Sequence, residues 1–154
     1  MGLHRYLRYI LLSSAMIILA FCVLLLFSSS RKKIDYNDSM FIQAACHAYN
    51  NTASEEFYIR YRESDKQFSI MYYQNSDQDF QPFIPSDDVQ IIFASGATGI
   101  KCFKAFDDLH YVLFIYDTLS LSVEEGCIIT SNPLRNDPKY QFLWQNEDCF
   151  AYSF

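Results

Sequence analysis

The stretch Phe57-Tyr58-Ile59-Arg60-Tyr61-Arg62 and its counterpart Phe68-Ser69-Ile70-Met71-Tyr72 decide the fold class of this chain. In the first stretch, Phe57, Ile59 and Tyr61 share one face, and the two arginines fall on the other. The same period of two returns in the second stretch, after the polar residues 63–66. Alternation of aromatic and β-branched residues indicates strands, and a short polar link predicts an antiparallel hairpin.

Several other short apolar runs predict further strands. Val89–Ala94 and Ile100–Phe106 flank a segment with two glycines, Gly96 and Gly99, which suits a second hairpin. Leu109–Tyr116 is almost continuously apolar, as in a central strand that is covered on both faces. Shorter predicted strands and the loops between them follow: strands Leu119–Val123, Cys127–Thr130, Tyr140–Gln145 and Cys149–Ser153, and loops Asn75–Asp88 and Asn132–Pro138.

One short helix is predicted before these strands. In Met40–Tyr49, the residues Phe41, Ala45 and Ala48 recur at spacings of four and three, and Asp38 or Ser39 can cap the first turn. A helix followed by six to eight strands gives an α+β domain that consists mainly of antiparallel sheet.

The N-terminal region contains a long apolar segment. Residues 9–27 hold no charge, and at about 1.5 Å per residue a helix of this length nearly spans a hydrocarbon core of about 30 Å. We predict a permanent transmembrane signal-anchor helix, because the run is longer than the core of a cleaved signal, although Ser28 and Ser30 could serve a cleavage site. A lipoprotein signal is disfavoured, since Phe21 precedes Cys22 where a small residue is required.

This segment divides the chain into four parts. Residues 1–8 form a short flank, 9–27 the signal-anchor, 28–38 a polar tether, and 39–154 one small β-rich domain. About 120 residues after the anchor suffice for one core and are too few for two. Basic residues flank both ends of the anchor, Arg5 and Arg8 before it and residues 31–33 after it, so the positive-inside rule does not decide its orientation.

The cysteines bear on the compartment of the domain. Four lie in it, widely spaced and without a Cys-x-x-Cys motif: Cys46, Cys102, Cys127 and Cys149. An even set of this kind favours one or two disulfides, with three pairings open, over a metal knuckle. The alternative is four buried thiols that pack as small hydrophobes. The disulfide interpretation predicts an extracytoplasmic domain, either periplasmic or extracellular.

The charge of the domain excludes one class of partner and favours another. All 18 acidic residues but only 7 of the 12 basic ones lie from Ile34 onward, so the formal charge there is 7 minus 18, or −11. This excess repels nucleic acid and anionic lipid, so we expect no nucleic-acid partner. It attracts a basic protein surface. The alternative is a solvated surface that keeps the domain soluble.

No catalytic, cofactor or metal motif stands out. Cys46 and His47 are neighbours on the predicted helix and point in different directions, and His110 lies in the most apolar predicted strand. Asp87-Asp88 and Asp107-Asp108 lack the periodic ligands of a calcium loop, and turn chemistry explains both pairs. We therefore predict no enzyme activity, no cofactor and no metal. A hydrolase that uses His110 or a thiol is the least favoured alternative.

Together, these features predict a membrane-anchored extracytoplasmic binding protein that uses a β-sheet surface to engage a basic protein partner. It could act as an inhibitor or as an immunity-type protein. The alternative is a structural accessory subunit of a cell-envelope assembly, in which residues 9–27 pack against other membrane helices through the small residues Ser13, Ser14, Ala15 and Ala20.

Overall fold

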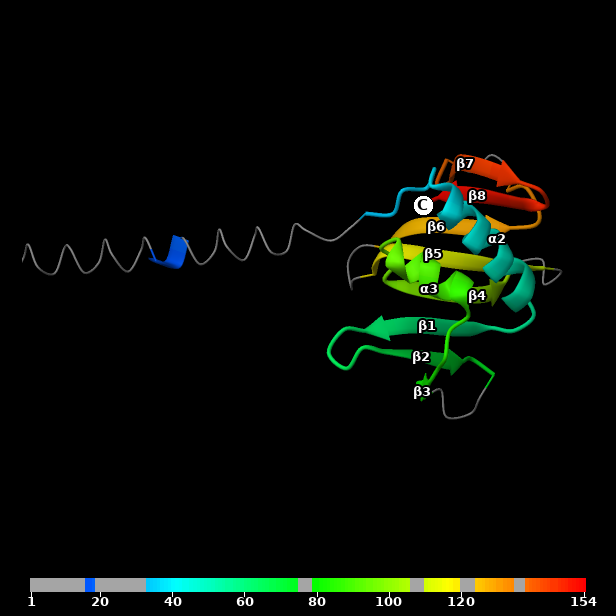
Figure 1. Cartoon of the computed structure of the whole chain (residues 1–154). Helices are drawn as coiled ribbons and strands as arrows, with labels where there is room; N and C mark the ends of the chain where they lie inside the picture. Colours follow the sequence, from blue (N-terminus) through cyan, green and yellow to red (C-terminus); the bar gives the residue numbers. More distant parts are fainter. Residues whose placement is uncertain (1–15, 19–32, 75–78, 106–109, 120–123, 135–137) are drawn as a thin grey trace, which may run out of the picture. The chain divides into compact units, whose positions relative to one another are not determined.

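In a computed structural model, residues 33–154 form an antiparallel sheet of eight strands with two helices on one of its faces (Figure 1). The structure describes residues 16–18, 33–74, 79–105, 110–119, 124–134 and 138–154. Residues 1–32 are a separate unit, in which residues 16–18 are helical. The rest of the predicted anchor at 9–27 lies outside the described residues. No helix within the described part is long and apolar enough to cross a membrane.

The sheet has the order β3-β2-β1-β4-β5-β6-β8-β7, and every neighbouring pair of strands is antiparallel. The predicted α+β class, dominated by antiparallel sheet, is confirmed. The elements have these bounds: α2 Ser39–Thr52, β1 Phe57–Arg62, β2 Gln67–Tyr72, β3 Gln81–Pro82, α3 Asp87–Ala94, β4 Gly99–Lys104, β5 Tyr111–Leu119, β6 Glu124–Thr130, β7 Gln141–Asn146 and β8 Cys149–Ser153.

Several predicted elements are confirmed. The first hairpin is β1–β2, in which Phe57 pairs with Tyr72 and Ile59 with Ile70. The long apolar run gives β5, an interior strand of the sheet, and the last three short runs in the described part give β6, β7 and β8. The predicted strand 119–123 overlaps the structure only at Leu119, the end of β5, because residues 120–123 lie outside the described part.

Helix α2 confirms the predicted helix and extends it at both ends. The side chain of Asp38 accepts a hydrogen bond from the backbone N–H of Met40 at 2.9 Å, which satisfies a free donor in the first turn. The last turn runs on to Thr52, whose hydroxyl donates to the backbone oxygen of Ala48. The buried face of the helix consists of small and aromatic residues: Phe41, Ala44, Ala45, Cys46, Ala48 and Tyr49.

The second predicted hairpin is wrong in its first strand, because residues 87–94 form helix α3. The hydroxyl of Ser86 caps this helix by accepting from the N–H of Val89 at 3.4 Å, and Asp87 and Asp88 place negative charge at its positive end. The sequence pattern places these cap residues in the predicted loop Asn75–Asp88. That loop also contains β3, which pairs with β2, while residues 75–78 lie outside the described part.

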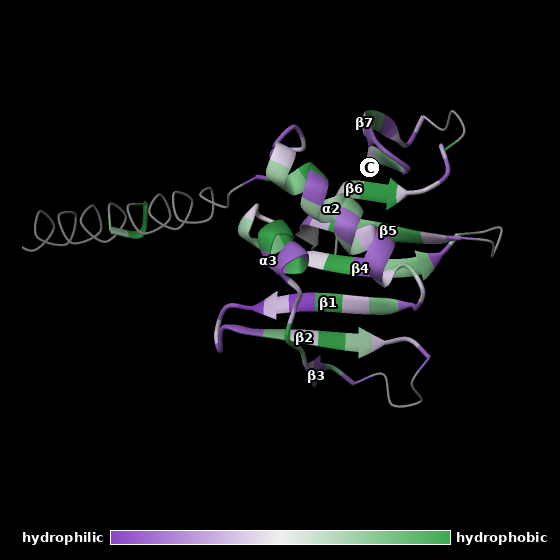
Figure 2. Ribbon diagram, turned by 45° about the vertical axis from the view of Figure 1, so that its right-hand side comes forward, coloured by the Kyte–Doolittle hydropathy of each residue, from purple (hydrophilic) through white to green (hydrophobic). Residues whose placement is uncertain are grey.

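The main core lies between the helices and one face of the sheet. Ile59, Ile100, Ile115 and Cys127 are successive register partners from β1 to β6, so their side chains point to the same face. All four are at most 1% exposed and belong to one cluster with the buried faces of α2 and α3. Figure 2 shows the strongly hydrophobic residues along β5 and β6, in the middle of the sheet.

The segment that leads into the domain is attached to β5. The carboxylate of Asp117 accepts from the backbone N–H of Ile34 at 3.0 Å and from the hydroxyl of Tyr36 at 2.7 Å. Asp117 lies where the pairing of β5 with β6 shifts register, between Tyr116 and Thr118. The predicted tether 28–38 therefore ends early, because Ile34 is already buried at 6% exposure.

Gly126 in β6 provides a test of this packing. A Cβ atom there would come within 2.1 Å of the backbone oxygen of Ile115, which cannot move without breaking the sheet. We expect Gly126→Ala to lower the free energy of unfolding by about 3 kcal/mol or more. At Gly99, the nearest atom to such a Cβ is in the ring of Tyr58, at 3.0 Å, and a side chain can shift. Urea unfolding should therefore show a smaller decrease in the free energy of unfolding for Gly99→Ala than for Gly126→Ala. Equal decreases in the two variants would contradict this geometry.

Candidate functional site

The sheet face opposite the helices carries a row of large side chains from six strands. Register partners place these residues side by side: Tyr58, Lys101, Phe114, Ile128, Tyr152 and Phe142. Helices α2 and α3 lie on the other face (Figures 1 and 2). Ile128 and Tyr152 are buried without belonging to the main core cluster, and Phe142 is 55% exposed. The aromatic face of the sheet thus packs largely through its own side chains.

Ring-to-ring contacts connect this aromatic face. Phe114 contacts Phe103 and Phe154 with centroid separations of 6.2 and 5.7 Å, both edge-on. Tyr116, on the same face, contacts Phe154 at 5.6 Å and is only 4% exposed. Two backbone hydrogen bonds with Gly126, at 3.1 and 3.4 Å, hold Phe154 beside β6. Phe154 thus joins the aromatic face through its pairing with the sheet.

Two cationic side chains lie over rings of the aromatic face. The ammonium of Lys101 is 5.2 Å from the ring centre of Tyr58 and 4.7 Å from that of Tyr116. The guanidinium of Arg60 lies 3.5 Å from the ring centre of Phe80. These are cation–π distances, so both charges help to hold the rings in place.

The helical side of the domain has a different surface. No Lys or Arg occurs in residues 34–59, 79–100 or 140–154. We call the carboxylates around α2 and α3 the helix-side acidic surface: Asp38, Glu55, Asp87, Asp88, Glu147 and Asp148. All of them are exposed except Asp88, whose side chain is 25% exposed and lies 3.6 Å from Nδ1 of His47. His47 is the one group in these three ranges that can become cationic in this surface.

The described basic side chains lie mainly on the strands. Arg60, Arg62, Lys101 and Lys104 come from β1 and β4. Arg62 forms an ion pair with Asp65 at 3.3 Å, in the link between β1 and β2. The two segments that hold the helices, residues 34–59 and 79–100, thus contain carboxylates and no Lys or Arg.

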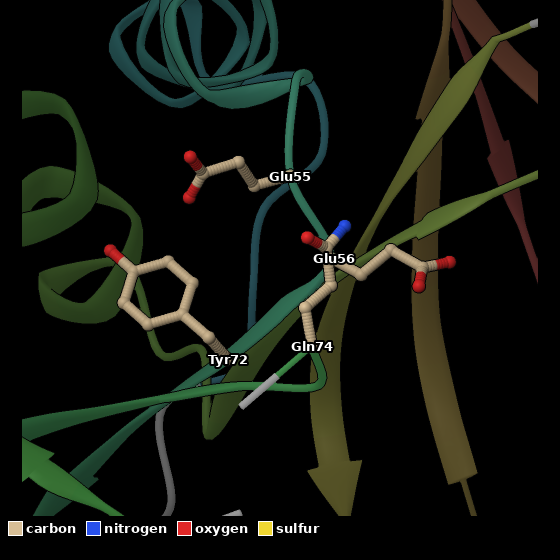
Figure 3. Close-up of a pocket in the computed structure, with 4 residues that line it drawn as sticks. All are labelled: Glu55, Glu56, Tyr72 and Gln74. Carbon is tan, nitrogen blue, oxygen red and sulfur yellow. The ribbon is translucent and has the colours of Figure 1, made fainter. Parts of the chain in front are cut away.

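A small open pocket lies beside the end of α2. Its volume is about 220 Å³, and Glu55, Glu56, Tyr72 and Gln74 line it. Figure 3 shows the carboxylates of Glu55 and Glu56 pointing to opposite sides. Glu56 also accepts a hydrogen bond from the backbone N–H of Lys104 at 3.2 Å. The two carboxylates therefore do not face a common reacting atom, as paired acids in a hydrolase do, and the pocket is smaller than an ordinary ligand site.

The histidines and cysteines singled out in the sequence do not come together as a catalytic pair. Cys46 is buried at 5% exposure, whereas the side chain of its neighbour His47 is 67% exposed and faces Asp88. His110 lies just before β5, not within it, and its backbone oxygen accepts from the N–H of Ala105. Asp107 and Asp108 lie outside the described residues.

The predicted disulfides are not formed in this structure, in which all four cysteines of the domain are buried thiols: Cys46, Cys102, Cys127 and Cys149. Burial raises the pKa of Cys102 to about 12 and also raises that of Cys127. Neutral thiols are poor nucleophiles and poor metal ligands. Among the described residues, no group of three His, Cys, Asp or Glu side chains is arranged to hold a metal ion.

Sequence reasoning missed both surfaces. The aromatic face depends on strand register, because Phe154 meets Phe114 and Tyr116 only through pairing of β5, β6 and β8. The helix-side acidic surface depends on α3, which the sequence did not reveal. The absence of Lys and Arg from three separate ranges was a visible signal for it.

Tyrosines on the aromatic face provide a test by pH. Burial raises the pKa of Tyr116 above its usual value near 10, and that of Tyr58 and Tyr73 in the same direction. The neutral form therefore contributes stability that is complete below pH 10 and is lost as the pH rises further. We expect each pH unit above 10 to cost wild type about 1.4 kcal/mol more than Tyr116→Phe in urea unfolding. Identical pH profiles would show that this ring is not held neutral by burial.

Comparisons of the chain with protein-family models, with curated proteins and with solved structures found no match. The functional conclusion therefore depends on the surfaces described above and on the chemistry of their residues.

Proposed function

We propose that this chain is a membrane-anchored, extracytoplasmic binding protein whose helix-side acidic surface engages a basic protein partner. The observation that carries the proposal is the one-sided charge of the helical layer. Its exposed carboxylates come from the starts of α2 and α3, the end of α2 and the turn between β7 and β8. No Lys or Arg of the same segments neutralises them.

Electrostatics supports a charged partner over an apolar one. Exposed carboxylates with few neighbouring cations produce a negative potential that raises the rate of encounter with a basic surface. Asp87 and Asp88 already interact favourably with the N-terminus of α3, so their charge is held in a fixed place. A partner with Lys or Arg on its contact surface can form ion pairs with these carboxylates, whose positions are already held by the domain.

The β7 edge adds a second kind of contact at the margin of this surface. β7 is the last strand of the sheet, carries no charged residue and presents Phe142 at 55% exposure. The turn that follows it contains Glu147 and Asp148. An extended basic segment could hydrogen-bond to this edge and place its cations near the two carboxylates. The opposite edge, β3, has two residues and contains Pro82, which suits strand addition poorly.

The test is capture of the partner by the full-length protein from its native membrane, in mild detergent. Asp87→Asn combined with Asp88→Asn removes two charges from the acidic surface, while Ser86 still caps α3. We expect the double variant to recover the partner at least several-fold less than wild type. The matched control, Glu63→Gln with Asp65→Asn, makes the same change of net charge in the β1–β2 link and should leave recovery near wild type.

Salt provides the second arm of the same experiment. If the contact is ionic, recovery should fall as the salt concentration rises past about 0.15 M, where charges screen within about 8 Å. An equal decrease in partner recovery for both double variants would show that binding depends on the net charge of the domain and not on a defined surface. Recovery of the partner that depends neither on salt nor on any of the four carboxylates would contradict the proposal. If replacement of residues 9–27 by an unrelated membrane helix then abolished recovery, the accessory-subunit function would be favoured.

A further inference from the structure

Cys46 in α2 and Cys149 in β8 lie at the same place in the helix–sheet interface. The side chain of Asn146 donates to Sγ of Cys46 at 3.7 Å, and Sγ of Cys149 donates to the side-chain oxygen of Asn50 at 3.9 Å. Asn146 is the cross-strand partner of Cys149, and Asn50 lies one helical turn after Cys46. Each thiol is therefore held by a neighbour of the other.

The thiols also interact directly. Burial, the charge of Cys46 and a hydrogen bond that Cys149 donates to Cys46 together raise the pKa of Cys149 to about 12, and burial raises the pKa of Cys46 as well. The pair is 5% and 1% exposed, respectively. The two sulfur atoms thus share one closed, partly polar site between the helix and the sheet.

Cys102 and Cys127 are not placed to bond to each other. Cys102 in β4 and Cys127 in β6 lie on opposite sides of β5, with Leu113 the partner of Cys102 and Ile115 the partner of Cys127. Two strand spacings separate their Cα atoms by about 9.5 Å or more. A disulfide requires the two Cα atoms to lie less than about 7 Å apart. Cys127 pairs with Ser153, which puts it about four residues along the strands from Cys149.

We propose that Cys46 and Cys149 form a disulfide that joins α2 to β8, and that Cys102 and Cys127 remain thiols. Once Cys46 bonds to Cys149, the only bond left is Cys102 to Cys127, and these two lie two strands apart, so the structure supports a single bridge. This inference stands on the placement of the four side chains and is independent of the proposed partner.

The reaction is an exchange with an external disulfide, for which oxidised glutathione is the probe. One cysteine, as its thiolate, attacks a sulfur of that disulfide, which forms a mixed disulfide and releases one glutathione thiolate. The second cysteine, also deprotonated, then attacks the protein sulfur of the mixed disulfide and releases the other. Two protein thiols are oxidised, two glutathione thiols are formed, and the two protons pass to solvent or to the released thiolates.

Burial determines when this exchange can happen. Raised pKa values and low exposure make the folded thiols slow nucleophiles. The bond therefore forms during folding, before α2 closes over β8, or when α2 opens transiently. Once formed, it closes a loop of roughly 100 residues between the first helix and the last strand of the domain, and long loops give the larger stabilisation.

The test refolds the purified full-length protein from denaturant with reduced and oxidised glutathione, blocks free thiols with iodoacetamide, and maps the peptides by mass spectrometry. We expect one cross-linked peptide pair, containing Cys46 and Cys149, with Cys102 and Cys127 alkylated. Breaking the bond with dithiothreitol should lower the melting temperature by about 10 °C.

Matched variants keep the result independent of folding yield. Cys102→Ser with Cys127→Ser should still form the cross-link, and dithiothreitol should still shift its melting temperature. In Cys149→Ser, dithiothreitol should cause no shift. A cross-link that contains Cys102 or Cys127, or complete alkylation of both Cys46 and Cys149 after refolding, would overturn the proposal.

Discussion

Burial of one apolar face of the sheet beneath α2 and α3 is the constraint on which the rest of the structure depends. Ile59, Ile100 and Ile115 line up across three strands, and the small residues of α2 let the helix approach them closely. Burial of these side chains supplies most of the favourable free energy of a domain of this size. Since the helices cover this face, their outer sides become one surface of the domain, and the uncovered side of the sheet becomes another.

The two surfaces differ because different forces act on them. The uncovered face must protect its own apolar area, and it does so with rings that contact each other and with Lys101 and Arg60 above them. Gly99 leaves room for the ring of Tyr58, and Gly126 leaves room for the backbone of Ile115 and Tyr116. The helical layer has its apolar side fully engaged in the core, so its outer positions are free to carry charge. The proposed binding function assigns recognition to the helical layer for this reason.

The sequence allowed the fold class and most strands to be predicted, because alternation in β1 and β2 and the apolar run of β5 depend on local pattern. The error at residues 87–94 has a physical cause. The residue types of this segment favour a strand: Val89, Ile91, Ile92 and Phe93. A helix forms because Ser86 caps it and two aspartates follow in its first turn. The placement of Cys46 beside Cys149 depends on contacts between the two ends of the domain, and no local pattern in the sequence contains that information.

Site-specific photocrosslinking in the native membrane tests the central claim most directly, namely that the helical layer is the contact surface. A photoreactive residue at Gln43 in α2 or Gln90 in α3, both exposed, should cross-link to a partner protein with a basic contact surface. The same residue at Gln67, an exposed β2 position on the aromatic side of the sheet, should give no such product. Cross-links from Gln67 together with none from Gln43 or Gln90 would contradict the account.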